Sequence, residues 1–64
     1  MRVPLVPYRA PLGAVAAKVA RLRVSLGGCL RYRNPHEREF SAEFDTQAAA
    51  DSFAWAMRQV GLLR

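Results

Sequence analysis

The chain has little of the chemistry that small proteins commonly use to stabilise themselves or to react. Its 64 residues include one cysteine and one histidine, so there is no pair for an internal disulfide and no cluster for a structural metal. The sequence also lacks a glycine-rich phosphate loop, paired catalytic carboxylates and a nucleophile beside a base. We therefore expect no enzymatic activity, no metal and no cofactor. The unpaired Cys29 indicates a reducing compartment such as the cytoplasm.

Acidic residues are absent from the first half of the chain. Residues 1–36 hold seven Arg or Lys and no Asp or Glu, whereas residues 37–64 hold three basic and five acidic residues, for a net charge of +5. A basic half attracts polyanions, and nucleic acid, anionic lipid and an acidic protein surface all fit that field. No apolar run approaches the length of a membrane span. We expect duplex DNA or a protein partner, and no membrane.

The chain is also short of the residues that would build a large core. Its 64 residues form one small domain that is 52% apolar, much of it alanine. A single core in a domain of this size rarely contributes more than about 3 to 5 kcal/mol. A homodimer or a stable complex with a partner would add buried surface, and both remain open.

Residues 21–44 alternate between apolar and charged side chains. Arginine or glutamate stands at many odd positions, and outside residues 34–38 the even positions carry apolar residues or glycine: Leu22, Val24, Leu26, Gly28, Leu30, Tyr32, Phe40, Ala42 and Phe44. This period of two predicts a three-stranded antiparallel sheet over residues 19–44, with one apolar and one charged face. The strands are expected at about 19–26, 29–33 and 38–44.

Two turns would connect these strands. A three-residue loop at 27–29 pairs Leu26 with Leu30 and keeps arginine off the apolar face. An unbroken strand through both glycines preserves the same alternation and remains an alternative. Asn34 and Pro35 stand in the order that favours a second turn, at residues 34–37.

The flanking segments have different patterns. Three prolines in residues 1–11 predict an extended arm, and residues 12–20 predict either a short helix or a direct lead into the first strand. After Asp45 the apolar period lengthens to that of a helix, expected at 46–61, with Asp45 or Thr46 as its cap and Gly61 as its stop. Its apolar side contains Ala49, Phe53, Ala56, Met57 and Val60, of which Phe53, Met57 and Val60 would lie against the sheet. The predicted class is α+β: a three-stranded antiparallel meander backed by a C-terminal helix, with or without a short N-terminal helix.

One stretch of the chain resembles a known family. The strand and turn Leu30-Arg31-Tyr32-Arg33-Asn34-Pro35, and the run Phe44-Asp45-Thr46 before three alanines, resemble the DNA-binding domain of plant ethylene-response factors. That domain is related in fold to the arm-binding N-terminal domain of tyrosine integrases. The resemblance covers about residues 20–61. It implies that an arginine-bearing sheet enters the major groove of duplex DNA while the helix braces the sheet.

Four arginines on the charged face are the candidate nucleic-acid ligands: Arg21, Arg23, Arg31 and Arg33. The planar guanidinium fork fits both phosphates and guanine edges. The alternative is internal pairing. If Tyr32 lies opposite Phe40, then Arg33 faces Glu39 on the next strand, and the face is a solvated surface with ion pairs.

Trp55 is the main candidate for a protein contact. With Phe53 packed inward, Trp55 points outward near Ser52 and Gln59, and tryptophan is enriched in binding hot spots. The alternative is that the N-terminal segment folds over Trp55 as a second layer. In either case we expect Trp55 to be covered. The sequence thus yields two hypotheses: a regulatory or accessory DNA-binding module that uses the arginines, or a small inhibitor or adaptor that binds a protein through Trp55.

Overall fold

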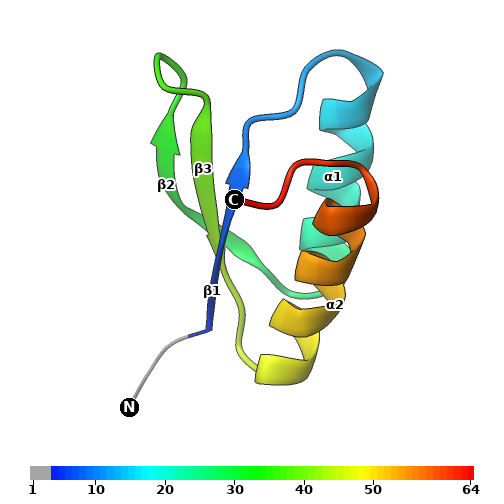
Figure 1. Cartoon of the computed structure of the whole chain (residues 1–64). Coiled ribbons are helices and arrows are strands. Elements are labelled where there is room, and N and C mark those ends of the chain that lie inside the picture. Colours follow the sequence, from blue (N-terminus) through cyan, green and yellow to red (C-terminus); the bar gives the residue numbers. More distant parts are fainter. Residues whose placement is uncertain (1–3) are drawn as a thin grey trace.

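The computed structural model describes residues 4–64 and contains three strands and two helices (Figure 1). The chain order is β1 (Leu5–Arg9), α1 (Ala14–Ser25), β2 (Cys29–Asn34), β3 (Glu39–Glu43) and α2 (Gln47–Gln59). The strands form one antiparallel sheet in the order β1-β3-β2, and both helices lie on the same side of it. The predicted α+β class, with a three-stranded antiparallel sheet and a C-terminal helix, is confirmed.

The first predicted strand is wrong, because residues 19–25 belong to helix α1. The alternation in this stretch also contains a helical spacing, since Val19, Leu22 and Leu26 recur at intervals of three and four. Val19 is buried and the other two pack half-buried against the core. Val24, which a strand would have turned inward, is exposed. The short helix expected at 12–20 is therefore part of a longer one.

The sheet takes its remaining strand from the segment predicted as an extended arm, whose first three residues lie outside the described part. Strand β1 pairs with β3 and not with β2, so the sheet is not the sequential meander that we predicted. It contains a split β-α-β unit, in which β1 and β2 run parallel with β3 between them. Strand β1 tolerates a proline because residue 7 directs its backbone polar groups away from β3. The Pro7 carbonyl accepts a hydrogen bond from the Arg64 amide, at 3.3 Å, on the outer edge of the strand. The missing Pro7 N–H therefore costs no bond to β3.

The core lies between the sheet and the helices and is built around aromatic rings. Tyr8 meets Phe40 and Phe53 edge-on, with ring centres 5.8 and 5.1 Å apart, and Phe44 lies 5.1 Å from Phe53. Phe53 and Met57 are fully buried, as predicted. Val60 is not, because it is the C-cap residue that follows the last turn of α2, and its side chain is 54% exposed.

Glycine ends both helices in the same way. Beyond α1, the Gly27 and Gly28 amides donate to the carbonyls of Val24 and Arg23, and Gly27 has a φ of 77°. This hydrogen-bond pattern is a Schellman motif, so residues 27–29 follow a helix and do not form the predicted hairpin loop. Gly61, with a φ of 73°, ends α2 as predicted.

The remaining predicted boundaries agree closely with the structure. The Thr46 hydroxyl accepts from the Ala49 amide at 3.1 Å and caps α2, so Thr46 and not Asp45 is the capping residue. The second turn is confirmed, and the Asn34 side chain accepts from the Glu37 amide at 3.2 Å within it. Strand β3 is shorter than expected because Arg38 adopts a left-handed conformation, with a φ of 55°, just before the strand begins.

Candidate interaction site

The four candidate arginines do not share one face of the sheet. Arg21 and Arg23 belong to α1, whereas Arg31 and Arg33 belong to β2. On α1, Arg21 is exposed, while Arg23 is half-buried and its Nη1 donates to the Gly28 carbonyl at 2.9 Å. The arginine-bearing sheet face that the resemblance implied is therefore not formed.

A β-bulge separates the two arginines of β2. The pairing shifts between Leu30, which faces Ala42, and Tyr32, which faces Ser41. The extra residue is Arg31, and the alternative pairing of Tyr32 with Phe40 and of Arg33 with Glu39 is not formed. After the bulge, Arg33 faces Phe40, and its guanidinium lies 5.7 Å from the centre of that ring. Since side chains of paired residues share a side of the sheet, Arg33 lies on the helix-facing side.

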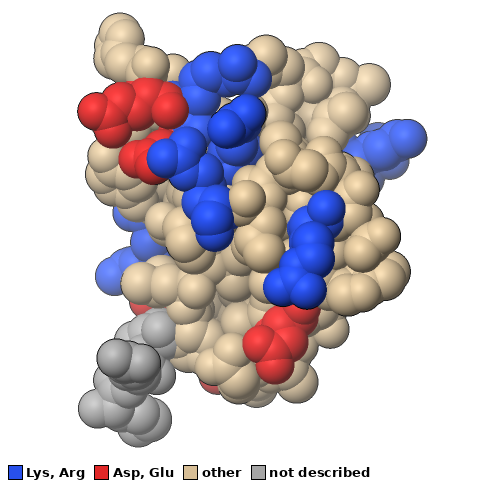
Figure 2. Space-filling model, viewed as in Figure 1, with Lys and Arg blue, Asp and Glu red and all other residues tan. Residues whose placement is uncertain are grey.

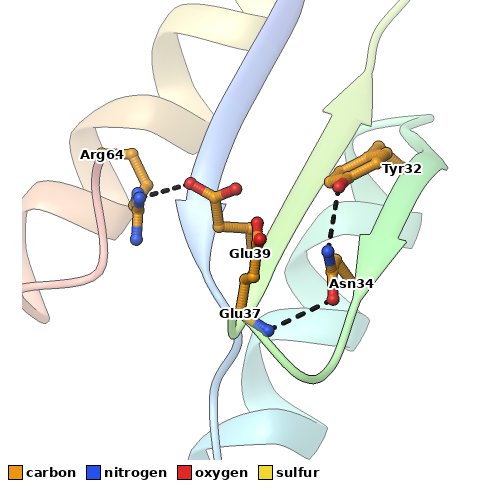
Figure 3. Close-up of polar contacts among 5 residues, drawn as sticks. All are labelled: Tyr32, Asn34, Glu37, Glu39 and Arg64. Carbon is orange, nitrogen blue, oxygen red and sulfur yellow. Dashed lines mark hydrogen bonds and ion pairs between the residues drawn. The ribbon is translucent and has the colours of Figure 1, made fainter.

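The outer face of the sheet carries charges of both signs, and the exposed Arg9 of β1 lies opposite Glu39 on it. Its central strand β3 presents Glu39 and Glu43, and these form ion pairs with Arg64 and with Arg31, the latter at 3.5 Å. Figure 3 shows Arg64 beside Glu39, and a chain of polar contacts from Tyr32 through Asn34 to the Glu37 backbone. Two carboxylates at the centre of this face would repel the phosphates of DNA.

Trp55 is uncovered. It lies on the outer side of α2 and is 64% exposed, with the exposed Ser52 and Gln59 one helical turn away on either side. The expected cover from the N-terminal segment is wrong, because that segment is used elsewhere. Val6 and Tyr8 are part of the sheet core, and the residues of α1 pack beside α2.

A groove lies between the two helices, and Trp55 is not among the residues that line it. It has a volume of about 220 Å³ and is lined by α1 and the C-terminal end of α2. Two of its lining side chains are large, apolar and exposed: Val15 at 43% and Val60 at 54%. Lys18, also exposed, lies in its wall. Sequence analysis missed Val15 and Lys18; the signal was their helical spacing with Val19 and Leu22.

The exposed charges of the two helices are mostly positive. The exposed basic residues of α1 and α2 are Lys18, Arg21 and Arg58, and the only acidic residue of either helix is Asp51. Asp51 accepts from the Gln47 side chain at 2.8 Å. Within residues 4–64, the ion pairs are those of Arg31 and Arg64, so none involves a helix. In the view of Figure 2, basic side chains cover more of the surface than acidic ones. We call the exposed outer side of the two helices, which includes Val15, Lys18, Arg21, Trp55, Arg58 and Val60, the helical surface.

The described part of the chain contains no group of three or more His, Cys, Asp or Glu side chains that could hold a metal ion. Cys29 is a free thiol on the surface. Neither helix in residues 4–64 has the length and apolar character that crossing a membrane requires. Comparison with protein-family models, with curated proteins and with solved structures found no match to this chain.

Proposed function

We propose that this protein is a non-catalytic interaction module whose helical surface binds an acidic, partly apolar segment of a partner protein. The observation that carries the proposal is the exposure of Trp55 on α2, a helix whose Ala50, Phe53 and Met57 are buried in the core. Full burial of a large apolar side chain stabilises by about 1.5 to 3 kcal/mol. A chain with so small a core leaves that stabilisation unused unless a partner covers the ring.

The exposed valines support the same surface. Val15 and Val60 line the groove between the helices and remain exposed there. A partner side chain that entered this groove would bury both of them. Binding hot spots are enriched in tryptophan and cluster at well-packed pockets, and the two helices present both an exposed tryptophan and an apolar groove.

Charge selects the chemistry of the partner. Lys18, Arg21 and Arg58 are exposed on the helices against the single Asp51. A segment that carries carboxylates beside its apolar residues complements this surface, whereas a second copy of the chain would bring another net charge of +5 toward it. An acidic amphipathic helix is the simplest such segment.

The test uses the fluorescence of Trp55, the only tryptophan of the chain. The probe is a synthetic amphipathic peptide with leucines on one helical face and glutamates beside them, and its control carries lysine at each glutamate position. We expect the acidic peptide to shift Trp55 emission to the blue and the basic peptide to leave it unchanged. The Lys18→Glu, Arg21→Glu variant should reverse that preference.

Two results would overturn the proposal. One is an equal affinity of the acidic peptide for the wild type and for Trp55→Ala, with binding to both proteins measured by NMR. The other is a blue shift that grows with protein concentration in the absence of peptide, which would indicate a homodimer on this surface. Phe40 lies away from Trp55, so the conservative Phe40→Leu variant controls for a general loss of aromatic packing.

A second candidate function is nucleic-acid binding, in line with the resemblance to ethylene-response factors. The observation that favours it is that α1 carries three basic residues and no acidic one, in a chain with a net charge of +5. Binding would then use the outer side of α1, where Lys18 and Arg21 are exposed. Its role would be regulatory or accessory.

Fluorescence anisotropy of labelled duplex DNA across a salt series tests this second function. The logarithm of the affinity should fall by about 0.9 per neutralised phosphate for each tenfold rise in salt, and more shallowly for Lys18→Glu, Arg21→Glu. Trp55→Ala should leave DNA binding unchanged. For a protein of this charge, no binding at low salt would exclude the nucleic-acid function and leave the protein-binding function untouched. Both functions suit a reducing compartment such as the cytoplasm, which the single cysteine favours.

A further inference from the structure

We propose that a second site, a pocket between α1 and the sheet, binds a small organic acid: a carboxylate or a phosphate monoester carried on a compact apolar body. The pocket has a volume of about 260 Å³ and lies apart from the helical surface. Its polar groups come from Tyr8, Arg23 and Arg33. Val19, Leu30 and Phe40 contribute to its apolar walls.

Two guanidinium groups line this pocket without a counter-charge. The residues that line it include no Asp or Glu, and neither Arg23 nor Arg33 forms an ion pair within residues 4–64. Arg23 is half-buried, so water screens its charge less than it screens the charge of a fully exposed arginine. An anion between the two guanidinium groups offsets their charge and gains hydrogen bonds to charged donors, which are about twice as strong as neutral ones.

Both arginines are positioned by contacts that leave donors free. The Arg23 guanidinium is held by one bond, from Nη1 to the Gly28 carbonyl at 2.9 Å, which uses one of its five N–H groups. Arg33 lies over the Phe40 ring, with 5.7 Å between the guanidinium carbon and the ring centre. This contact uses none of the guanidinium N–H donors of Arg33, so they can bind a ligand.

Tyr8 supplies a neutral donor at the same place. Its ring is buried in the core, and burial raises the pKa of its phenol above the usual 10.0, while the charge of Arg23 acts in the opposite direction. Tyr8 and Arg23 both line the pocket. At neutral pH the phenol is protonated, so it can donate a hydrogen bond to an anion.

The size and walls of the pocket define the rest of the ligand. An apolar cavity of about 150 Å³ is enough for a benzene ring, so this pocket accommodates a ring or a short branched chain together with one acidic group. Purely inorganic anions would leave the walls of Val19, Leu30 and Phe40 unused. The chemistry is therefore that of an aryl or short alkyl acid.

The test is calorimetric titration with phenyl phosphate and benzoate, with the contact mapped by amide NMR. We expect dissociation constants of about 1 mM or below, and shifts concentrated at the amides of Gly28 and Arg33. Arg33→Gln should weaken binding by about tenfold or more, because it removes a charged donor. Arg21→Gln is the matched control, since it removes the same charge from the solvent side of α1, and it should leave the affinity unchanged.

Several outcomes would overturn the proposal. Absence of binding at about 10 mM ligand would do so, as would equal binding of inorganic phosphate and phenyl phosphate, or an equal loss of affinity in Arg21→Gln. A further control ligand is glutamate amide with a capped amino group, which represents a carboxylate on a protein side chain. If it binds as tightly as benzoate, the pocket binds a side chain of a partner protein and not a small organic acid. Arg33 is exposed, so Arg33→Gln should keep the fold.

Discussion

The two helices are nearly equal in length but contribute differently to the protein. Helix α2 buries Ala50, Phe53 and Met57 and begins with a side-chain cap from Thr46. Helix α1 buries Val19 alone among its residues and begins at Gly13 without a side-chain cap. Yet α1 contributes to both the groove and the pocket. The comparison indicates that α2 stabilises the fold, whereas α1 supplies surface for binding and depends on α2 and the sheet for its position.

The test of this difference with the largest expected effect is truncation of one core residue in each helix. Phe53→Ala should cost about 3 to 5 kcal/mol, since it removes the ring at the centre of the core. For a domain of this size that is most or all of the stability, so we expect the variant to be unfolded. Val19→Ala removes two buried carbons and should cost about 2 kcal/mol. Circular dichroism with thermal and urea unfolding measures both.

The milder Phe53→Leu variant keeps the comparison measurable when Phe53→Ala has no folded state. We expect Phe53→Leu to fold. Its loss of unfolding free energy relative to the wild type should still exceed the loss caused by Val19→Ala. An equal or smaller loss for Phe53→Leu would contradict the assignment of α2 as the stabilising helix.

The same contrast explains what sequence analysis could predict. Helix α2 was predictable because its apolar period, its cap at Thr46 and its stop at Gly61 are all local signals that agree. In α1, the alternation of Arg21 to Leu26 fits a strand and a helix equally, so local pattern did not decide. The deciding contacts are distant in sequence, because β1 pairs with β3 and brings Val6 and Tyr8 into the core, so the sheet has three strands without residues 19–26.

The binding surfaces were predictable in part for a related reason. The outward direction of Trp55 followed from the position of Phe53 on the same helix. Its lack of cover did not, since that depended on where Val6 and Tyr8 pack. The separation of Arg31 from Arg33 depends on a bulge, and nothing in the alternating sequence of β2 marks the extra residue.

The exit from α1 offers an intermediate test, since two adjacent glycines there serve different purposes. A Cβ on Gly28 would meet the ring of the buried Phe44, at 2.8 Å from Cζ, whereas a Cβ on Gly27 would meet nothing within 4 Å. Gly28→Ala should therefore cost about 1 to 3 kcal/mol through overpacking. Gly27→Ala should cost about 1 kcal/mol through its left-handed backbone alone.

Urea unfolding of the two glycine variants ranks these costs. A double variant, Gly28→Ala with Phe44→Leu, shows how much of the destabilisation by Gly28→Ala comes from the clash with the Phe44 ring, because the smaller side chain makes room for the added methyl group. If Gly28→Ala is no more costly than Gly27→Ala, then α1 is held by its end motif and not by close packing of the following loop on Phe44.

The smallest of these effects concerns the start of α2. Thr46→Ala removes the hydroxyl that accepts from the Ala49 amide at 3.1 Å. Loss of an N-cap of this kind costs about 1 kcal/mol, and Thr46→Ser, which keeps the hydroxyl, should cost less. Because the first turn of α2 leads directly to the buried Ala50 and Phe53, the loss should lower global stability as well as increase amide exchange in that turn. Faster exchange confined to the first turn, with an unchanged urea midpoint, would mean that α2 stabilises the protein through Phe53 and Met57 alone and that its cap is dispensable.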